Sequence, residues 1–196
     1  MCGILMWTYF SQSAGHIAGT LTGNTHIFSK VYFPRLIMPL SQLISNVFAF
    51  AIQFVVFAML WLYFKHKGAP LELNLQSLLI FPLVLQCAAL ALGFGLIIAA
   101  LTAKYRDLMH ALTFLLQLWM YATPVIYPLS QVPERWRWIV QLNPMAPVIE
   151  GTKAALLGSG TGGISGFAFS IVTTGIVLVS GLVFFHHAER NFVDTV

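Results

Sequence analysis

Charged residues are scarce in this sequence. Only 8% of its 196 residues are Asp, Glu, Lys or Arg, whereas soluble domains usually carry about a quarter. Hydrophobic residues make up 58% of the chain, more than one core can bury at this length, so lipid must cover the excess. A β-barrel would show short runs of alternating polarity, but the apolar runs here are continuous. The composition therefore predicts an all-α, polytopic helical membrane protein.

The sequence lacks the motifs of an ATP-binding or catalytic protein. It contains no GxxxxGK[ST] pattern, which excludes a P-loop, and no nucleophile–base–acid set. Gly158, Gly160 and Gly163 formally satisfy GxGxxG, but no strand precedes them. A flexible connector before an apolar segment explains these glycines. We therefore expect a chain that is not an enzyme and that holds no cofactor.

The sequence gives equally little support for a metal site, a disulfide bond or a nucleic-acid-binding surface. The net charge of +4 is spread thinly between apolar runs, which favours contacts with membrane lipid headgroups over nucleic acid. Cys2 and Cys87 both lie in apolar stretches, where they serve as small hydrophobes. His186 and His187 point about 100° apart on a helix and have no third ligand nearby, so we predict no metal site.

Apolar segments predict five transmembrane helices. They lie at about residues 1–23, 36–64, 74–103, 108–127 and 166–185. Five spans place the chain ends on opposite sides of the membrane. The ten Lys and Arg residues divide five against five between the two sides, so the positive-inside rule leaves the orientation open.

Polar and small residues mark the first segment. Gly15, Gly19 and Gly23 fall on one helix face, which favours close helix packing and leaves a homodimer seam as the alternative. His16 either lines a pathway or hydrogen-bonds a neighbouring helix. The loop at 24–35 carries Lys30 and Arg35, and is typical of a surface helix, a partner-docking segment or a plain connector.

The middle of the chain, residues 103–158, has an unusual order of parts. Pro124 and Pro128 should break the end of the fourth span, and irregular backbone at membrane depth is tolerated only inside protein or beside water. Tryptophans and arginines follow at 135–138, a pattern typical of the headgroup layer. These features predict short interfacial or re-entrant helices that form a lid on a translocation path. Glu150 is costly in its apolar setting, with Arg135 or Arg137 as expected partners.

The sequence resembles the permease subunits of bacterial ABC exporters for polysaccharides and polyol phosphates, within the type-2 ABC permease superfamily. Four pieces carry the resemblance, in order: GNTHIFSKVYFPRLIMPLS at 23–41, LTAKYRDL at 101–108, FLLQLWMYATPVIYPLSQVPERWRWIVQLNPMAPVIEG at 114–151 and AERNFVDT at 188–195. The family exports O-antigen, capsule or teichoic-acid chains. Its members usually begin with an amphipathic helix and one further span, six in all, so this single domain of 196 residues is expected to lack both.

The resemblance implies partners, a location and an orientation. It implies a homodimer of permeases with two separate ATP-binding ABC subunits, in the bacterial inner membrane, moving a lipid-linked polysaccharide. It also implies that the 24–35 loop, the 104–107 segment and the C-terminus are cytoplasmic. The residues expected to couple to the ATPase are Lys30, Tyr32, Arg35, Tyr105, Arg106 and Asp107.

A sugar chain needs a wide path with flat stacking surfaces, because aromatic faces pack against sugar rings. Six aromatic residues are candidates to line it, with lipid-facing or core positions as the alternative: Trp7, Tyr9, Phe10, Trp119, Tyr121 and Tyr127. The gate is expected to use Pro124, Pro128, Glu134, Arg135, Trp136, Arg137, Trp138, Asn143, Pro144 and Glu150. The competing functions are an exporter of drugs or other lipids, and a truncated, non-transporting membrane subunit.

Overall fold

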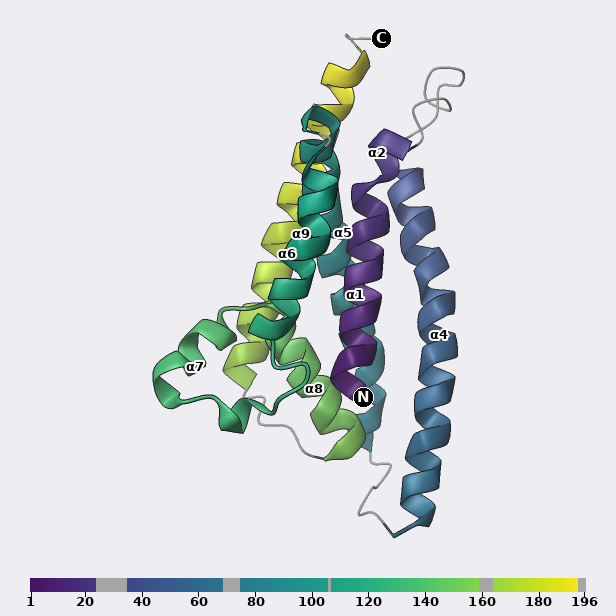
Figure 1. Cartoon of the computed structure of the whole chain (residues 1–196), viewed down its shortest axis with the longest axis vertical. Coiled ribbons are helices and arrows are strands. Elements are labelled where there is room, and N and C mark those ends of the chain that lie inside the picture. Colours follow the sequence, from purple (N-terminus) through teal and green to yellow (C-terminus); the bar gives the residue numbers. More distant parts are fainter. Residues whose placement is uncertain (24–34, 69–74, 106, 159–163, 194–196) are drawn as a thin grey trace.

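The chain folds entirely into helices and their connections over the part that the structure describes. This computed structural model describes residues 1–23, 35–68, 75–105, 107–158 and 164–193. No strand occurs within these ranges (Figure 1). The all-α prediction is therefore confirmed. Most of the predicted 24–35 loop, including Lys30 and Tyr32, lies outside the described residues.

Long helices alternate with short ones along the chain. The long elements are α1 (Cys2–Ala18), α4 (Ile37–His66), α5 (Ile80–Lys104), α6 (Leu108–Ala122) and α9 (Ile164–Val193). The short elements are α2 (Thr20–Gly23), η1 (Leu75–Leu79), η2 (Leu129–Gln131), α7 (Glu134–Gln141) and α8 (Met145–Leu157). Figure 1 shows α8 beside the N-terminus and α7 projecting from one side of the bundle, both toward the end opposite the C-terminus.

Three of the five predicted spans are long and apolar enough to cross a membrane. They are Ile37–His66, Gln76–Lys104 and Gly166–Glu189. The other two predicted spans correspond to shorter helices, α1 with 17 residues and α6 with 15. A helix of 15 residues is only about 22 Å long, less than the roughly 30 Å of a hydrocarbon core. The chain is a multi-pass membrane protein whose two shorter helices lie against long ones.

The most extensive helix–helix contact of the bundle joins α5 and α9, which approach each other at glycines. A Cβ atom added at Gly93 would lie 2.7 Å from the Cα of Leu178 in α9. A Cβ added at Gly181 would meet the carbonyl oxygen of Gly93 in the same way. Two helix backbones can come this close only where side chains are absent. Helix α1 packs against α5 as well, whereas α9 contacts mainly α5 and α8.

Helix α4 lies at the periphery of the bundle and rests mainly on α1 (Figure 1). It buries only Pro39, Asn46 and Trp61. Asn46 Oδ1 lies 3.1 Å from His16 Nδ1, which confirms the interpretation of His16 as a hydrogen-bond partner of a neighbouring helix. Trp61 donates its indole N–H to the carbonyl of Leu156 at 2.9 Å and so ties α4 to α8.

The glycine stripe of α1 has one close contact. A Cβ atom added at Gly19 would lie 3.2 Å from the terminal methyl of Met109 in α6. Positions 15 and 23 have open space around them. Close helix packing therefore explains Gly19, but not Gly15 or Gly23.

Candidate functional site

Helix α6 ends where the sequence places the break. Its last residue is Ala122, five residues before the predicted end of the fourth span. Pro124 has no N–H and its ring disfavours the helical conformation of the preceding residue, so Thr123 is extended, with φ −105° and ψ 142°. Residues 123–128 then run irregularly, with Thr123, Pro124 and Val125 buried. We call residues 123–128 together with α8 the junction.

The first link in the junction is a side-chain hydrogen bond from Asn143. Its amide nitrogen donates to the hydroxyl oxygen of Thr123 at 2.7 Å. Its amide oxygen accepts from the backbone N–H of Met145 at 3.1 Å, which satisfies a donor at the start of α8. Thr123 in turn donates to the carbonyl of Trp119 at 2.7 Å. The end of α6 and the start of α8 are joined by one network.

The second link is the ammonium group of Lys153, which faces three acceptors. It donates to the carbonyl oxygens of Pro124 and Tyr127, at 2.6 and 3.3 Å, and to Glu150 Oε1 at 3.0 Å. An ammonium group has three donors, so this set can satisfy all of them. Lys153 therefore holds backbone carbonyls that no helix satisfies.

Glu150 pairs with the lysine one turn along its own helix. The prediction that Arg135 or Arg137 pairs with Glu150 is wrong, because Glu150 forms its ion pair with Lys153, at 3.0 Å. Glu150 is only 4% exposed, and α8 places residues three apart on one face, so Lys153 reaches the acid without leaving its helix. The arginines belong to α7, where Arg137 is half-buried and Arg135 is exposed.

The start of α1 packs closely against the irregular segment of the junction. A Cβ atom added at Gly3 would lie 2.5 Å from the carbonyl oxygen of Val125 and 3.2 Å from a methyl of Ile149. Real Cβ atoms essentially never come so close to a backbone oxygen. The position requires glycine because two other segments of the chain occupy its side-chain space.

Helix α7 is amphipathic and projects from the junction as an arm. It buries no residue, and Trp136 and Trp138 are 55% and 59% exposed. The guanidinium of Arg135 lies 5.9 Å from the ring centre of Trp136. Pro128 and Glu134 are exposed as well, while Pro144 is half-buried. Exposed indoles beside arginines suit the headgroup layer, as the sequence predicts.

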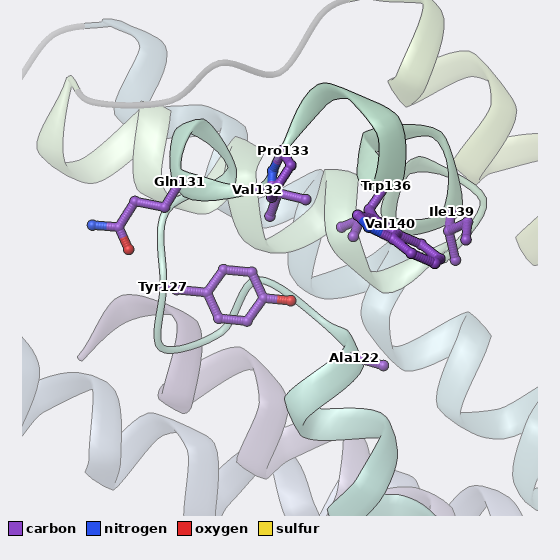
Figure 2. A pocket seen from close by; sticks show the side chains of 8 residues that line it. All are labelled: Ala122, Tyr127, Gln131, Val132, Pro133, Trp136, Ile139 and Val140. Atoms are coloured by element: carbon purple, nitrogen blue, oxygen red, sulfur yellow. The ribbon is translucent and has the colours of Figure 1, made fainter.

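An open groove of about 490 Å³ separates the arm from the end of α6. Figure 2 shows Trp136, Ile139 and Val140 on α7, with Tyr127 facing them from the irregular segment and Ala122 at the end of α6. The Tyr127 hydroxyl donates to the carbonyl of Tyr121 at 3.2 Å. Burial raises the pKa of Tyr127, so the phenol stays a protonated donor at neutral pH.

Four of the aromatic residues expected to line a path pack inside the bundle. The ring of Trp119 on α6 meets the rings of Trp7 and Phe10 on α1, with centroids 6.1 and 5.3 Å apart. Phe94 of α5 closes the cluster at 5.0 Å from Trp119. Tyr9 is also buried, with its ring 5.2 Å from that of Phe50. This cluster holds α1, α5 and α6 together.

The residues expected to couple to an ATPase lie at the other end of the bundle where they are described. Arg35 donates to the carbonyl of Glu189 at 2.9 Å, which links the start of α4 to the end of α9. Tyr105 is exposed, with the ammonium of Lys104 5.4 Å from its ring centre. Asp107 is exposed immediately before α6. Arg106 lies outside the described residues.

Comparison with known families settles the kind of protein. A family model described as ABC-2 type transporter matches residues 1–157 of the 196, which include α1 through α8 and the whole junction. The chain belongs to the ABC-2 type transporter family.

Two curated relatives of this ABC-2 chain carry the same name, O-antigen export system permease protein RfbA. The protein from Myxococcus xanthus is 29% identical over 155 residues, covering 78% of this chain and 57% of the relative. A protein from Klebsiella pneumoniae is 25% identical over 193 residues, covering 98% of this chain and 72% of the relative. The chain thus spans little more than half of the first relative and most of the second.

Sequence reasoning missed three residues that build the junction of this ABC-2 chain. Lys153 and Thr123 supply its two links, and Gly3 makes room for its backbone. The spacing of Glu150 and Lys153, three residues apart in an expected helix, was the available signal for the ion pair. Nothing in the sequence marks carbonyl oxygens as the other acceptors of Lys153.

Proposed function

We propose that this chain is the membrane permease subunit of an ATP-driven exporter that moves lipid-linked polysaccharide or polyol phosphate across the bacterial inner membrane. Membership of the ABC-2 type transporter family supports the transport role. The names of the relatives, which are O-antigen export permeases, support the substrate class. The alternatives, drug or lipid export and a non-transporting subunit, have no such support.

The structural support for this proposal comes from the junction. It places irregular backbone, held by Lys153 and Asn143, beside an open groove with aromatic walls. Backbone of this kind is tolerated at membrane depth when it is packed in protein or lines a watery cavity. We assign the junction and α7 to the exit gate, on the periplasmic side. The gate residues are Pro124, Tyr127, Pro128, Glu134, Arg135, Trp136, Arg137, Trp138, Asn143, Pro144 and Glu150, with Lys153 added.

The opposite end of the bundle is the proposed input side. ATP hydrolysis belongs to a separate ABC subunit, because this sequence has no P-loop pattern. Two permease copies and two such subunits form the transporter. The segments that dock on the ATPase are those with Lys30, Tyr32, Arg35, Tyr105, Arg106 and Asp107. The link from Arg35 to α9 supports this role, because it ties the start of α4 to the last turns of α9.

Deletion of the gene followed by analysis of both glycan pools tests the function. Loss of surface polysaccharide together with a build-up of lipid-linked polymer inside the cell is the expected result. Re-expression of the gene should reverse both changes. A mutant that keeps its surface glycan, and instead loses resistance to a drug or changes its membrane lipids, would assign the chain to another substrate.

A further inference from the structure

The contact between α1 and α4 contains polar side chains in a setting that is otherwise apolar. Helix α4 buries only three residues, and one of them is Asn46, whose amide oxygen lies 3.1 Å from His16 Nδ1 of α1. A buried carboxamide needs partners for its NH2 group as well as for its oxygen. The hydrogen bond to His16 satisfies only the oxygen, so the amide nitrogen needs another partner.

Tyr9, Ser13 and His16 form one row along the side of α1 that meets α4. At about 100° and 1.5 Å per residue, the three positions fall within roughly 60° of one another and span about 10 Å. The ring of Tyr9 lies 5.2 Å from that of Phe50, whereas His16 meets Asn46, so the two helices run antiparallel. Ser13 lies between these two contacts. We call Tyr9, Ser13, His16 and Asn46 the polar seam.

Three polar groups of the seam are buried and make no hydrogen bond within the described part of the chain. They are the Tyr9 hydroxyl, the Ser13 hydroxyl and the amide nitrogen of Asn46, and their residues are 2%, 0% and 6% exposed. Among the described residues, the other buried side-chain atom of this kind is Arg137 Nε. A buried polar group without a partner loses its hydration and gains nothing in return. Three of them at one helix contact indicate a partner that they share.

Ser13 differs in this respect from other hydroxyl residues of the same helix and its continuation. Thr8, Ser11 and Thr20 each donate to a backbone carbonyl three or four residues earlier, at 2.8, 3.3 and 2.7 Å. This local bond is a common way to satisfy a serine or threonine within a helix. The Ser13 hydroxyl makes no such bond in the described structure, and it lies on the row that meets α4.

We propose that the polar seam is a binding site for water, in which bound water molecules bridge Tyr9, Ser13 and Asn46 between α1 and α4. Buried water typically makes about three hydrogen bonds to polar groups that no protein group satisfies. A water molecule both donates and accepts, so it suits two hydroxyls and an amide N–H at the same time. The inference goes beyond the proposed function and holds for any transported substrate.

An ion fits the seam less well than water. Residues 36–64 carry no formal charge, and His16 is the one basic residue in the sequence of α1. A cation would meet the N–H donors of Asn46, and an anion would have no fixed positive charge beside it. An unpaired ion is far costlier to bury than a neutral molecule. His16 is exposed, so the seam reaches the surface of the bundle.

Radiolytic hydroxyl-radical labelling of the full chain, purified with its ABC subunit in lipid nanodiscs, tests the site. Radicals formed from bound water modify the side chains beside it, so Tyr9 should be modified severalfold more than in Ser13→Val or Asn46→Leu, whose apolar side chains displace water. Phe10 and Phe185 are as buried as Tyr9 but belong to the apolar core, and should stay at background in every protein. Modification of Tyr9 at the background level, or modification that neither variant lowers, would overturn the proposal.

Thermal unfolding of the same preparation gives an independent readout with opposite signs for a hydrated and a dry seam. With water bound, Tyr9→Phe and Ser13→Ala each remove one partner of the water and should lower the midpoint by a few degrees. The double variant should lower it by less than the sum, because both residues act on the same water. A dry seam predicts a higher midpoint, since each substitution then deletes an unpartnered hydroxyl.

The control for this measurement is Thr8→Val, because its hydroxyl is exposed and bonds to its own helix, so the midpoint should change little. A higher midpoint in Tyr9→Phe and Ser13→Ala would overturn the proposal. A midpoint of the unaltered chain that follows the concentration of sodium or chloride at constant ionic strength, and loses this dependence in Asn46→Leu, would assign the seam to an ion and overturn it as well.

Discussion

The ammonium group of Lys153 lies 2.6 Å from the carbonyl oxygen of Pro124, a residue 29 positions earlier in the chain. That carbonyl belongs to the segment in which the proline breaks α6, so no helical N–H is available to it. The same ammonium group neutralises the nearly buried Glu150. One side chain therefore holds the broken end of α6 against α8.

Removal of this side chain should loosen the junction. Lys153→Met removes the ammonium group that forms an ion pair with the nearly buried Glu150, and breaking a buried ion pair in this way costs about 3–5 kcal/mol. We expect a lower thermal unfolding midpoint in detergent and reduced export. Lys67→Met, at an exposed lysine on the same end of the bundle, is the control and should change neither. The double variant Glu150→Gln, Lys153→Met should recover part of the lost stability; no recovery would mean that the ion pair is not the source.

Contact between α1 and the junction makes position 3 sensitive to size. Gly3→Ala places a methyl group 2.5 Å from the carbonyl oxygen of Val125, and overpacking of this kind costs about 1–3 kcal/mol. Gly15→Ala lies on the same helix in open space and should be neutral or stabilising. Thermal unfolding of the two variants measures the difference. Equal midpoints would show that the start of α1 does not press on the junction.

The close approach of α5 and α9 gives a second matched pair of glycines. Gly181→Ala should separate the two helices, because its methyl group would collide with the carbonyl of Gly93. Gly175→Ala on the same helix has nothing within 4 Å and should fold normally. Yields of folded protein by size-exclusion chromatography distinguish them. A well-folded Gly181→Ala variant would contradict the packing of these helices.

Charge at the proposed input side should matter for coupling. Arg106→Ala is expected to leave assembly with the ABC subunit intact and to lower export, because charges at a docking loop give register and partner choice. Co-purification, ATPase activity and surface glycan are measured together, with Lys67→Ala as the control. Wild-type export with unchanged ATPase activity would remove Arg106 from the coupling role.

Much of the fold follows from hydropathy and prolines. The apolar runs predict α4, α5 and α9, and Pro124 predicts the end of α6, because these features act on a single helix. The predicted fourth span was five residues too long, since the break takes effect at Thr123, before the proline itself. Single-helix reasoning therefore finds elements and their approximate ends.

The site was harder to predict because it depends on contacts between distant segments. Trp7 and Trp119 suit a sugar path as well as a core by composition, and only the position of Phe94 shows that they pack inside. Lys153 was overlooked because its acceptors are mostly backbone carbonyls.

The most direct test of the exporter function is transport by the purified complex. The chain and its ABC subunit are reconstituted in proteoliposomes loaded with lipid-linked glycan, and the glycan that becomes accessible to an added glycosidase on the opposite leaflet is measured. We predict accessibility that requires ATP and that falls severalfold in Lys153→Met. Accessibility that is the same with and without ATP, in a complex that hydrolyses ATP, would contradict the account.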